Sequence, residues 1–302
     1  MPLHSVPLSR RHFIRTSVVG GLAMLTVRDA GAEEGVDSNR WALLSDTHIP
    51  SDPTIKKGNA DMTAHLQASL AEIKALPKRP VGLMVNGDCP YDFGVPEEYA
   101  HFVSLMKPVG EMKVPMHFTL GNHDRRENFW NALTEAAALP RPVAGKQVSI
   151  VESPAVNWFL LDSLEVTKQV PGRLGAEQLD WLTKALDARA DKPALIMVHH
   201  HPAANDPGKP AGIADAEAFL AVILPRRQVK AVFFGHTHVW QMTQREGMHL
   251  VNLPAVAYPF KETEPTGWVN CEIRPTAMTL ELRAHNTEHP AHGKVHELAW
   301  RA

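Results

Sequence analysis

The sequence lacks the features that mark several common classes of protein. It has only two cysteines, Cys89 and Cys271, among 302 residues, which excludes a disulfide-framework fold and leaves open whether the two pair. The formal net charge is −2 and like charges form no runs, so no nucleic-acid-binding patch is expected. The H-E-x-x-H helix motif of metalloproteases is also absent, which argues against that class of hydrolase.

Histidine, by contrast, is abundant. The chain has 17 histidines, and several fall in short clusters near apolar runs. With 44% hydrophobic and 21% charged residues, the composition is otherwise that of a globular domain with a substantial core. Because imidazole is the commonest metal ligand, this clustering makes metal coordination the first hypothesis.

Residues 1–32 have the pattern of an export signal. Arg10 and Arg11 precede a mostly apolar stretch at 17–27, and small residues follow at 30–32. The stretch is too short to cross a membrane comfortably, so we expect cleavage and no stable membrane anchor. The arginine pair resembles a twin-arginine signal, which implies the twin-arginine export machinery as a partner and a periplasmic or secreted location. A basic, disordered N-terminus or an uncleaved anchor is the alternative.

Short apolar runs alternate with helical periodicity along the rest of the chain. Strands are predicted at 41–45, 81–86, 115–120, 193–198 and 230–234, and helices at 61–76, 96–109, 127–139, 176–189 and 214–224. The segments 147–152 and 157–163 have the pattern of paired strands, and the part after residue 240 is strand-like with turns between. This pattern predicts a single α/β domain at 33–302, in which a second sheet packs on the first.

Polar residues with metal-binding side chains follow five of the predicted strands. They are Asp46 and His48, Asp88, Asn122 to Asp124, His199 to His201, and His236 and His238. Ligands of open α/β sheets gather beyond the carboxyl ends of the strands, so we expect the five ends to meet at one edge. A single Asp usually caps a turn, and a lone His is usually an ordinary core or surface residue. Five such ends together favour a shared metal site, because imidazole and oxygen donors suit divalent metals.

The spacing within these motifs is consistent with a metal site. Residues two apart in an extended strand end point the same way, so D-x-H at 46–48 and H-x-H at 236–238 can each present two donors. Gly87, Gly121 and Gly235 allow the backbone to turn sharply. Two neighbouring cations need a bridging anion, and Asp88 is the natural bridge.

The motifs D-x-H, GD, GNHD, H-x-P and GHTH, in this order, resemble those of the calcineurin-like metallophosphoesterases over residues 41–240. The segment GRLGAEQLDWL at 172–182 is similar to one in the branch that contains class III cyclic-nucleotide phosphodiesterases. The resemblance implies a four-layer αββα fold, a two-sheet β-sandwich flanked by helices. It also implies two divalent metal ions, for which mixed nitrogen and oxygen ligands accept Mn, Fe, Zn or Co.

Carried over position by position, the resemblance implies seven ligands. One ion is held by Asp46, His48, Asp88 and His238, and the other by Asp88, Asn122, His200 and His236. His200 is chosen among three consecutive histidines because the family ligand stands two residues before the proline, here Pro202. His199 and His201 then neighbour the site, unless the register is displaced by one residue.

The resemblance also implies that His123 faces the substrate, where it donates a hydrogen bond to phosphate or a proton to the leaving oxygen. Asp124 is the expected partner that orients this imidazole, although an Asp here would equally suit a turn cap. Arg125 and Arg126 could reach phosphate, but arginines after a turn are usually exposed and without special function, so they are left outside the site.

The implied function is hydrolysis of phosphomonoesters or phosphodiesters by attack of a metal-bridging hydroxide. The alternative is an exported metal-binding or sensing protein of the same fold without catalytic activity, although His123 beside a complete ligand set favours chemistry. The substrate is a small phosphate ester, and the loops that would select it, such as 49–62, 89–94 and 201–215, carry no signal for one class. Export favours extracellular phosphate esters over an intracellular cyclic nucleotide.

Overall fold

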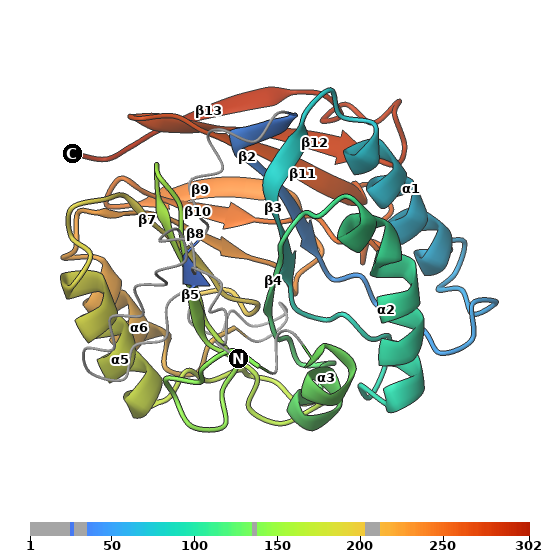
Figure 1. The fold of residues 1–302 in the computed structure, drawn as a ribbon, viewed down its shortest axis with the longest axis horizontal. Coiled ribbons are helices and arrows are strands. Elements are labelled where there is room, and N and C mark those ends of the chain that lie inside the picture. The colour runs from blue at the N-terminus through green and yellow to red at the C-terminus, as the bar shows by residue number, and fades with distance from the viewer. Residues whose placement is uncertain (1–24, 27–34, 135–137, 203–211) are drawn as a thin grey trace, which may run out of the picture.

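The computed structural model describes residues 25–26, 35–134, 138–202 and 212–302, in which two β-sheets pack face to face (Figure 1). The predicted export segment lies outside the described residues, except for Leu25–Thr26. Within the described ranges no helix has the length and apolar character that a membrane crossing requires.

The first sheet has six strands in the order β13-β12-β11-β2-β3-β4. Along the chain these are β2 (Val36–Ser45), β3 (Arg79–Asn86), β4 (Met116–Thr119), β11 (Gly267–Ile273), β12 (Ala277–Ala284) and β13 (Val295–Ala299). The β2, β3 and β4 strands are parallel neighbours, whereas β11 pairs with β2 in the antiparallel sense. The carboxyl ends of three buried parallel strands therefore lie together.

The second sheet has the order β1-β5-β6-β7-β8-β10-β9. Along the chain its strands are β1 (Leu25–Thr26), β5 (Ser149–Glu152), β6 (Asn157–Leu160), β7 (Ala194–Met197), β8 (Val229–Phe234), β9 (Gln241–Arg245) and β10 (Met248–Asn252). The β6, β7 and β8 strands are parallel neighbours.

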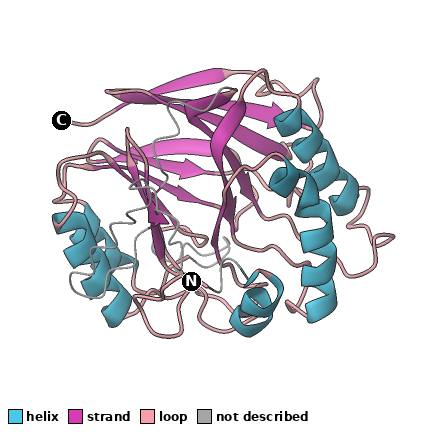
Figure 2. Cartoon of the chain, in the orientation of Figure 1, coloured by secondary structure: helices cyan, strands magenta, loops and turns pink. Residues whose placement is uncertain are grey.

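Helices cover the outer face of each sheet (Figure 2). On the first sheet lie α1 (Met62–Lys74), α2 (Pro96–Glu111) and α3 (Arg126–Ala132), and on the second lie α5 (Ala176–Asp187) and α6 (Ala216–Ile223). Three apolar clusters separate these layers: one between α1, α2 and the first sheet, one between the two sheets, and one under α5 and α6. The predicted αββα sandwich is thus confirmed, because each sheet buries apolar side chains on both faces.

The strands are distributed between the sheets differently from the sequence prediction. The C-terminal strands do not form a sheet of their own, since β11 to β13 extend the sheet of β2 while β9 and β10 extend the sheet of β8. This arrangement pairs β2 and β8 on both sides, so no central strand keeps an unpaired edge in the core. The helix predicted at 127–139 is interrupted after Ala132, because Leu133 has non-helical angles of φ −108° and ψ 71°, and the chain is helical again at Thr134. Cys89 and Cys271 are both buried and free.

Candidate metal centre

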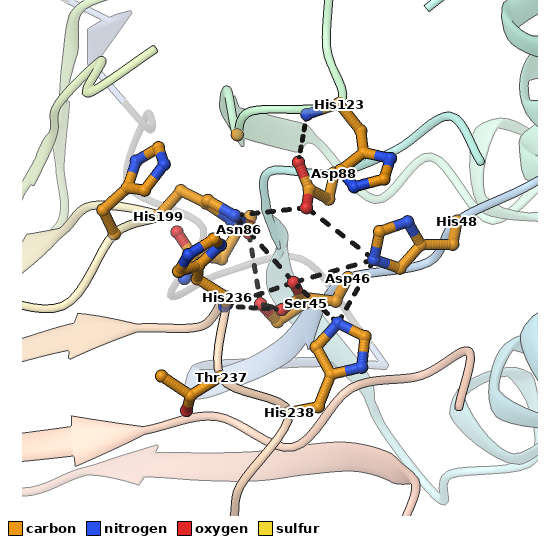
Figure 3. Close-up of polar contacts among 12 residues, drawn as sticks. Ser45, Asp46, His48, Asn86, Asp88, His123, His199, His236, Thr237 and His238 are labelled. Carbon is orange, nitrogen blue, oxygen red and sulfur yellow. Dashed lines mark hydrogen bonds and ion pairs between the residues drawn. The ribbon is translucent and has the colours of Figure 1, made fainter. Parts of the chain in front are cut away.

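The predicted motifs meet at one end of the sandwich, but they come from both sheets rather than from one sheet edge (Figure 3). The first sheet supplies Asp46 and His48 after β2, Asp88 after β3, and Asn122 to Asp124 after β4. The second sheet supplies His199 and His200 after β7, and His236 and His238 after β8. The prediction of a single edge was wrong because parallel strands of both sheets end on this side, so their last residues meet across the sandwich.

Asp46, His48 and His238 form the first group of donors. The Nε2 atoms of the two histidines are 3.2 Å apart, and Asp46 Oδ1 lies 3.4 Å from His238 Nε2 and 4.0 Å from His48 Nε2. None of the three residues is more than 1% exposed. Donor atoms of this type at these separations can share one metal ion.

His199, His200 and His236 form a second group, in which the donor nitrogens lie within 4.8 Å of one another. The Nε2 atom of each ring is buried without a hydrogen-bond partner among the described residues, and so is Oδ1 of Asn122. Asp88 connects the two groups, because its Oδ2 is 3.7 Å from His48 Nε2 and 3.3 Å from His199 Nε2. A carboxylate that bridges two ions would have to take this position.

The electrostatics favour an ionised Asp46 and neutral His48 and His236, the forms that bind metals. Burial tends to raise the pKa of Asp46, but the neighbouring His199 and His238 lower it to about 2. Burial lowers the pKa of His48 to about 3 and, together with the charge of His199, lowers that of His236 to about 3. For His199, burial lowers the pKa, but Asp88 and Asp46 outweigh it and raise the pKa to about 10.

Main-chain carbonyls fix the tautomers of several rings. The Nδ1 atom of His238 lies 2.5 Å from the carbonyl oxygen of Tyr258, and that of His123 lies 2.7 Å from the carbonyl oxygen of Tyr91. Because a carbonyl can only accept, Nδ1 carries the hydrogen in both rings. The lone pair of a neutral ring is then on Nε2, the atom that faces the centre of the site.

The backbone around the donors is strained. Of the eight non-glycine residues with positive φ in the described part of the chain, five are candidate ligands: Asp46, His48, Asp88, His236 and His238. Their φ values of 43° to 67° lie in the left-handed region, which costs about 1 to 3 kcal/mol for a residue with a side chain. The D-x-H and H-x-H pairs therefore reach the site through left-handed turns, not through the extended alternation predicted from the sequence.

Two of the three glycines in these motifs serve a different purpose from the one predicted. Gly87 does turn the chain, with φ +70°, whereas neither Gly121 nor Gly235 has a positive φ. A Cβ at Gly121 would overlap Asp88 Oδ1 and the His199 ring, and a Cβ at Gly235 would overlap Ser45 Oγ and Asp46 Oδ2. At these two positions glycine makes room for the donors.

Asp124 does not orient His123, contrary to the sequence prediction, because the turn after β4 directs its carboxylate back under the loop. Asp124 Oδ2 accepts hydrogen bonds from the main-chain N–H groups of Asp88 and Gly121, at 2.8 Å each, and Oδ1 accepts from the hydroxyl of Tyr99 at 2.8 Å. Burial and the charge of Asp88 raise the pKa of Asp124 to about 7. Asp124 thus holds the loops that carry Asp88 and Asn122, and the Tyr91 carbonyl orients His123.

The arginines after this motif are placed differently from each other. Arg126 forms a bidentate pair with the buried carboxylate of Asp162, at 2.8 and 3.0 Å, whereas Arg125 is exposed. Both arginines line, with Phe93 and Thr167, a pocket of about 350 Å³. The pocket lies beside the GNHD loop, because the Thr167 hydroxyl donates to the carbonyl of Asp124 at 2.7 Å.

Sequence reasoning missed several residues around the donors. Phe260 stacks on the ring of His238, with centroids 4.0 Å apart and planes 7° apart, and Tyr258 packs against the rings of both His48 and His238. Ser45 hydrogen-bonds Asp46 through its hydroxyl. No motif marks these residues, although Tyr258 and Phe260 are among few aromatics in the C-terminal part of the chain.

The donors fit divalent metal ions. The site offers buried imidazole, carboxylate and amide groups, a set that suits first-row divalent metals. Several of their buried polar atoms have no hydrogen-bond partner among the described residues. Burial without a partner is costly, and a bound ion would supply the missing partner. Which of these residues bind metal stays a prediction.

Comparisons with known proteins point the same way. A family described as calcineurin-like phosphoesterase matches residues 40–240. A probable cyclic nucleotide phosphodiesterase of Synechococcus is 31% identical over 239 residues, which cover 78% of this chain and 87% of the relative. A glycerophosphodiester phosphodiesterase of Enterobacter lignolyticus is 26% identical over 230 residues, 74% of this chain and 81% of the relative.

The fold has solved counterparts as well. A dimetal phosphatase from Danio rerio superposes with a TM-score of 0.67 at 15% identity, covering 87% of this chain and 99% of that one. At this identity the likeness concerns the fold, and the family match and the sequence relatives carry the assignment. The chain therefore belongs to the calcineurin-like phosphoesterase family and is a metal-dependent phosphoesterase.

Proposed function

We propose that the chain hydrolyses phosphate esters with two divalent metal ions held side by side at the ends of its strands. One ion would be held by Asp46, His48, Asp88 and His238, and the other by Asp88, Asn122, His200 and His236. The observation that carries the proposal is the position of Asp88. Its Oδ2 lies 3.7 Å from Nε2 of His48, and its Oδ1 accepts from the main-chain N–H of His123, the neighbour of Asn122, at 2.7 Å, so the carboxylate lies between the two proposed ligand sets.

Two such ions, when bound, supply the charge that polarises the phosphoryl oxygens and the acidity that makes water nucleophilic near neutral pH. The chain prepares the donors for this. The N–H of His123 donates to Asp88 Oδ1 at 2.7 Å, which fixes the carboxylate plane and leaves Oδ2 directed at both donor groups. Asp124 holds the main chain at Asp88, so the bridging carboxylate starts from a rigid loop.

His123 is suited to act on the substrate. Its ring is the only predicted site side chain of the described part that is not buried, and it packs edge-on against His48 with centroids 4.6 Å apart. Because Nδ1 donates to the carbonyl of Tyr91, a proton held on Nε2 is the one that can pass to the leaving oxygen or hydrogen-bond to phosphate.

Among phosphate esters we favour phosphodiesters. The relatives named above are named for cyclic nucleotides and for glycerophosphodiesters, and both are diesters. The pocket that Phe93, Arg125 and Thr167 line beside the GNHD loop offers room for a second alcohol group. An aryl phosphodiester should therefore be hydrolysed with a higher kcat/KM than the matching aryl phosphomonoester, and the reverse order would contradict this preference.

The test of the metal site combines a metal count with activity. Purified protein is stripped of metal, reloaded with Mn, Fe, Zn or Co in turn, and assayed on both aryl esters. We expect two ions per chain, loss of metal and activity together in Asp88→Ala, and retention of metal with slower turnover in His123→Ala. A single ion in the fully active protein would refute the two-metal site, and a wild-type rate in His123→Ala would refute the role of His123.

Residues 1–32 are proposed to direct export by the twin-arginine pathway to the periplasm or beyond it. The support is the sequence pattern alone, with Arg10 and Arg11 before an apolar stretch too short to span a bilayer comfortably. Cell fractionation of the full chain should find the protein outside the cytoplasm. Replacing both arginines by lysine should leave it inside, and unchanged export of that variant would contradict the twin-arginine route.

A further inference from the structure

His199 is one of the two residues of the HHHP stretch, with His201, that the family resemblance leaves without a role. Its side chain is 0% exposed and lies between the two sheets, on the same side of the chain as Leu195 and Met197 of β7, whose side chains belong to the inter-sheet cluster. Figure 3 shows its ring directed at Asp88, on the opposite side of that carboxylate from His48. The ring therefore lies on the buried side of the site, between the two donor groups.

The hydrogen bonding of the ring leaves one nitrogen free for a ligand. Nδ1 lies 2.9 Å from the main-chain carbonyl oxygen of Asn86, which can only accept, so Nδ1 carries the hydrogen. Nε2 is buried and makes no hydrogen bond within the described part of the chain. A ring fixed in this way by a carbonyl presents its Nε2 lone pair, as metal-binding histidines commonly do.

The distances place this nitrogen close enough to both carboxylates for the three donors to bind one ion. Nε2 of His199 is 3.3 Å from Asp88 Oδ2 and 3.9 Å from Asp46 Oδ1. Two donors that each bind one ion at about 2.1 Å are roughly 3 to 4 Å apart, depending on the angle between them. The same spacing separates Asp46 from His238 and His48 from His238, at 3.4 and 3.2 Å.

The surrounding backbone is shaped to admit the ring. A Cβ at Gly87 would overlap Nδ1 of His199, and a Cβ at Gly121 would overlap Cδ2 and Cε1 of the same ring. The two loops that carry Asp88 and Asn122 thus both lack a side chain where the imidazole passes. This accommodation is independent of the polar contacts and brings Nε2 close to both carboxylates.

From these observations we infer that His199 is an additional ligand, through Nε2, of the ion held by Asp46, His48, Asp88 and His238. The inference rests on the proposed two-metal site and adds an eighth protein ligand to the seven that the resemblance supplies. The ion on the side of Asp46 then has five protein donors, whereas the ion on the side of Asn122 has four. The first ion is consequently the more tightly bound of the two.

The experiment is a calorimetric titration of metal-free protein with Mn, on wild type, His199→Leu and a control, His249→Gln. His249 is also buried with a ring nitrogen on a main-chain carbonyl, that of Ala299 at 2.7 Å, but it lies on β10 away from the site. We expect two resolved binding steps in wild type and control. In His199→Leu the Kd of the tighter step should rise at least about tenfold. Loss of a residue that only hydrogen-bonds a metal ligand already weakens metal binding by about 10- to 100-fold, so loss of a ligand should cost no less.

A second measurement holds even if His199→Leu folds poorly. Wild-type protein with ¹⁵N-labelled histidine is loaded with ¹¹³Cd, and the Nε2 resonance of His199 should show a direct coupling to cadmium. A doubly protonated His199 ring without that coupling would overturn the inference, and so would an unchanged tighter step in a folded His199→Leu. If the wild type took up two ions in either case, the proposed function would stand, whereas wild-type protein that bound no metal would overturn both.

Discussion

The hydroxyl of Tyr99 offers a sharp test of how the ligand loops are held. Tyr99 is fully buried on α2, and its hydroxyl donates to Asp124 Oδ1 at 2.8 Å while it accepts from the main-chain N–H of Arg125 at 3.0 Å. Asp124 in turn accepts from the N–H groups of Asp88 and Gly121. Tyr99→Phe removes one oxygen atom and leaves the aromatic packing in place, so its effect measures this network.

The magnitude follows from the two bonds. A hydrogen bond to a charged group contributes about 1.5 to 3 kcal/mol, and a buried N–H left unpaired costs about 1 to 3 kcal/mol. The N–H of Arg125 is only partly buried, so the cost of leaving it unpaired should be close to about 1 kcal/mol. Tyr99→Phe should therefore lower the free energy of unfolding by about 2 to 4 kcal/mol.

The assay is urea denaturation of the metal-free protein at about pH 9, where Asp124, with a pKa of about 7, is ionised. Tyr91→Phe is the matched control. The control also deletes a tyrosine hydroxyl near the site, but within the described residues that hydroxyl has no hydrogen bond. Tyr91→Phe should stay within about 0.5 kcal/mol of wild type. A Tyr99→Phe variant as stable as the control would refute the account of Asp124 as the anchor of the two loops.

Three further outcomes follow from buried polar groups. Burial lowers the pKa of His117 to about 4 from the ordinary value of 6.5. Between these two pH values the unfolded chain binds a proton at His117 that the folded chain does not, so the free energy of unfolding falls as the pH falls from about 6.5 to about 4. When the pH falls from about 7.5 to about 5, the free energy of unfolding of His117→Leu should fall by about 2 kcal/mol less than that of wild type. Urea denaturation at both pH values measures this, and an equal fall in the two proteins would contradict it. Asp162→Asn leaves Arg126 without its buried counter-charge and should lower the free energy of unfolding by about 3 kcal/mol; a change below about 0.5 kcal/mol would show that the pair does not stabilise the fold. Removing metal with a chelator should lower Tm, and restoring the ion at about 100 times its Kd should recover about 3 kcal/mol; a Tm independent of metal would mean that the ion does not bind the folded state selectively.

The layered fold and the gathering of donors at strand ends could be predicted because they depend on local pattern. Apolar runs such as 81–86 stop at a polar residue, and the structure ends β3 at Asn86, directly before Gly87 and Asp88. The partition of strands between two sheets could not be predicted, since the pairing of β2 with β11 joins residues more than 200 positions apart that carry no mutual signal.

The detail of the site depended on loop conformation, which periodicity does not report. Asp124 was predicted to orient His123 because the two residues are adjacent in the sequence. Adjacent residues in a turn point to different sides, and here the carboxylate of Asp124 accepts a hydrogen bond from Tyr99 instead. His199 was assigned no role for a related reason. Three consecutive histidines give no indication of which one faces the space between the sheets until the direction of β7 is known.

The origin of the donors in two sheets has a consequence for the chain as a polymer. His48 and His238 stand 190 positions apart, one on each sheet, and their Nε2 atoms face each other at 3.2 Å. An ion bound by both would act as a cross-link that closes most of the chain into a loop, and closing a loop of that length restricts the unfolded ensemble by roughly 5 kcal/mol in the chain-entropy account. The fold, with its two cysteines unpaired, would thereby gain from its metals the kind of stabilisation that a disulfide gives to many secreted proteins.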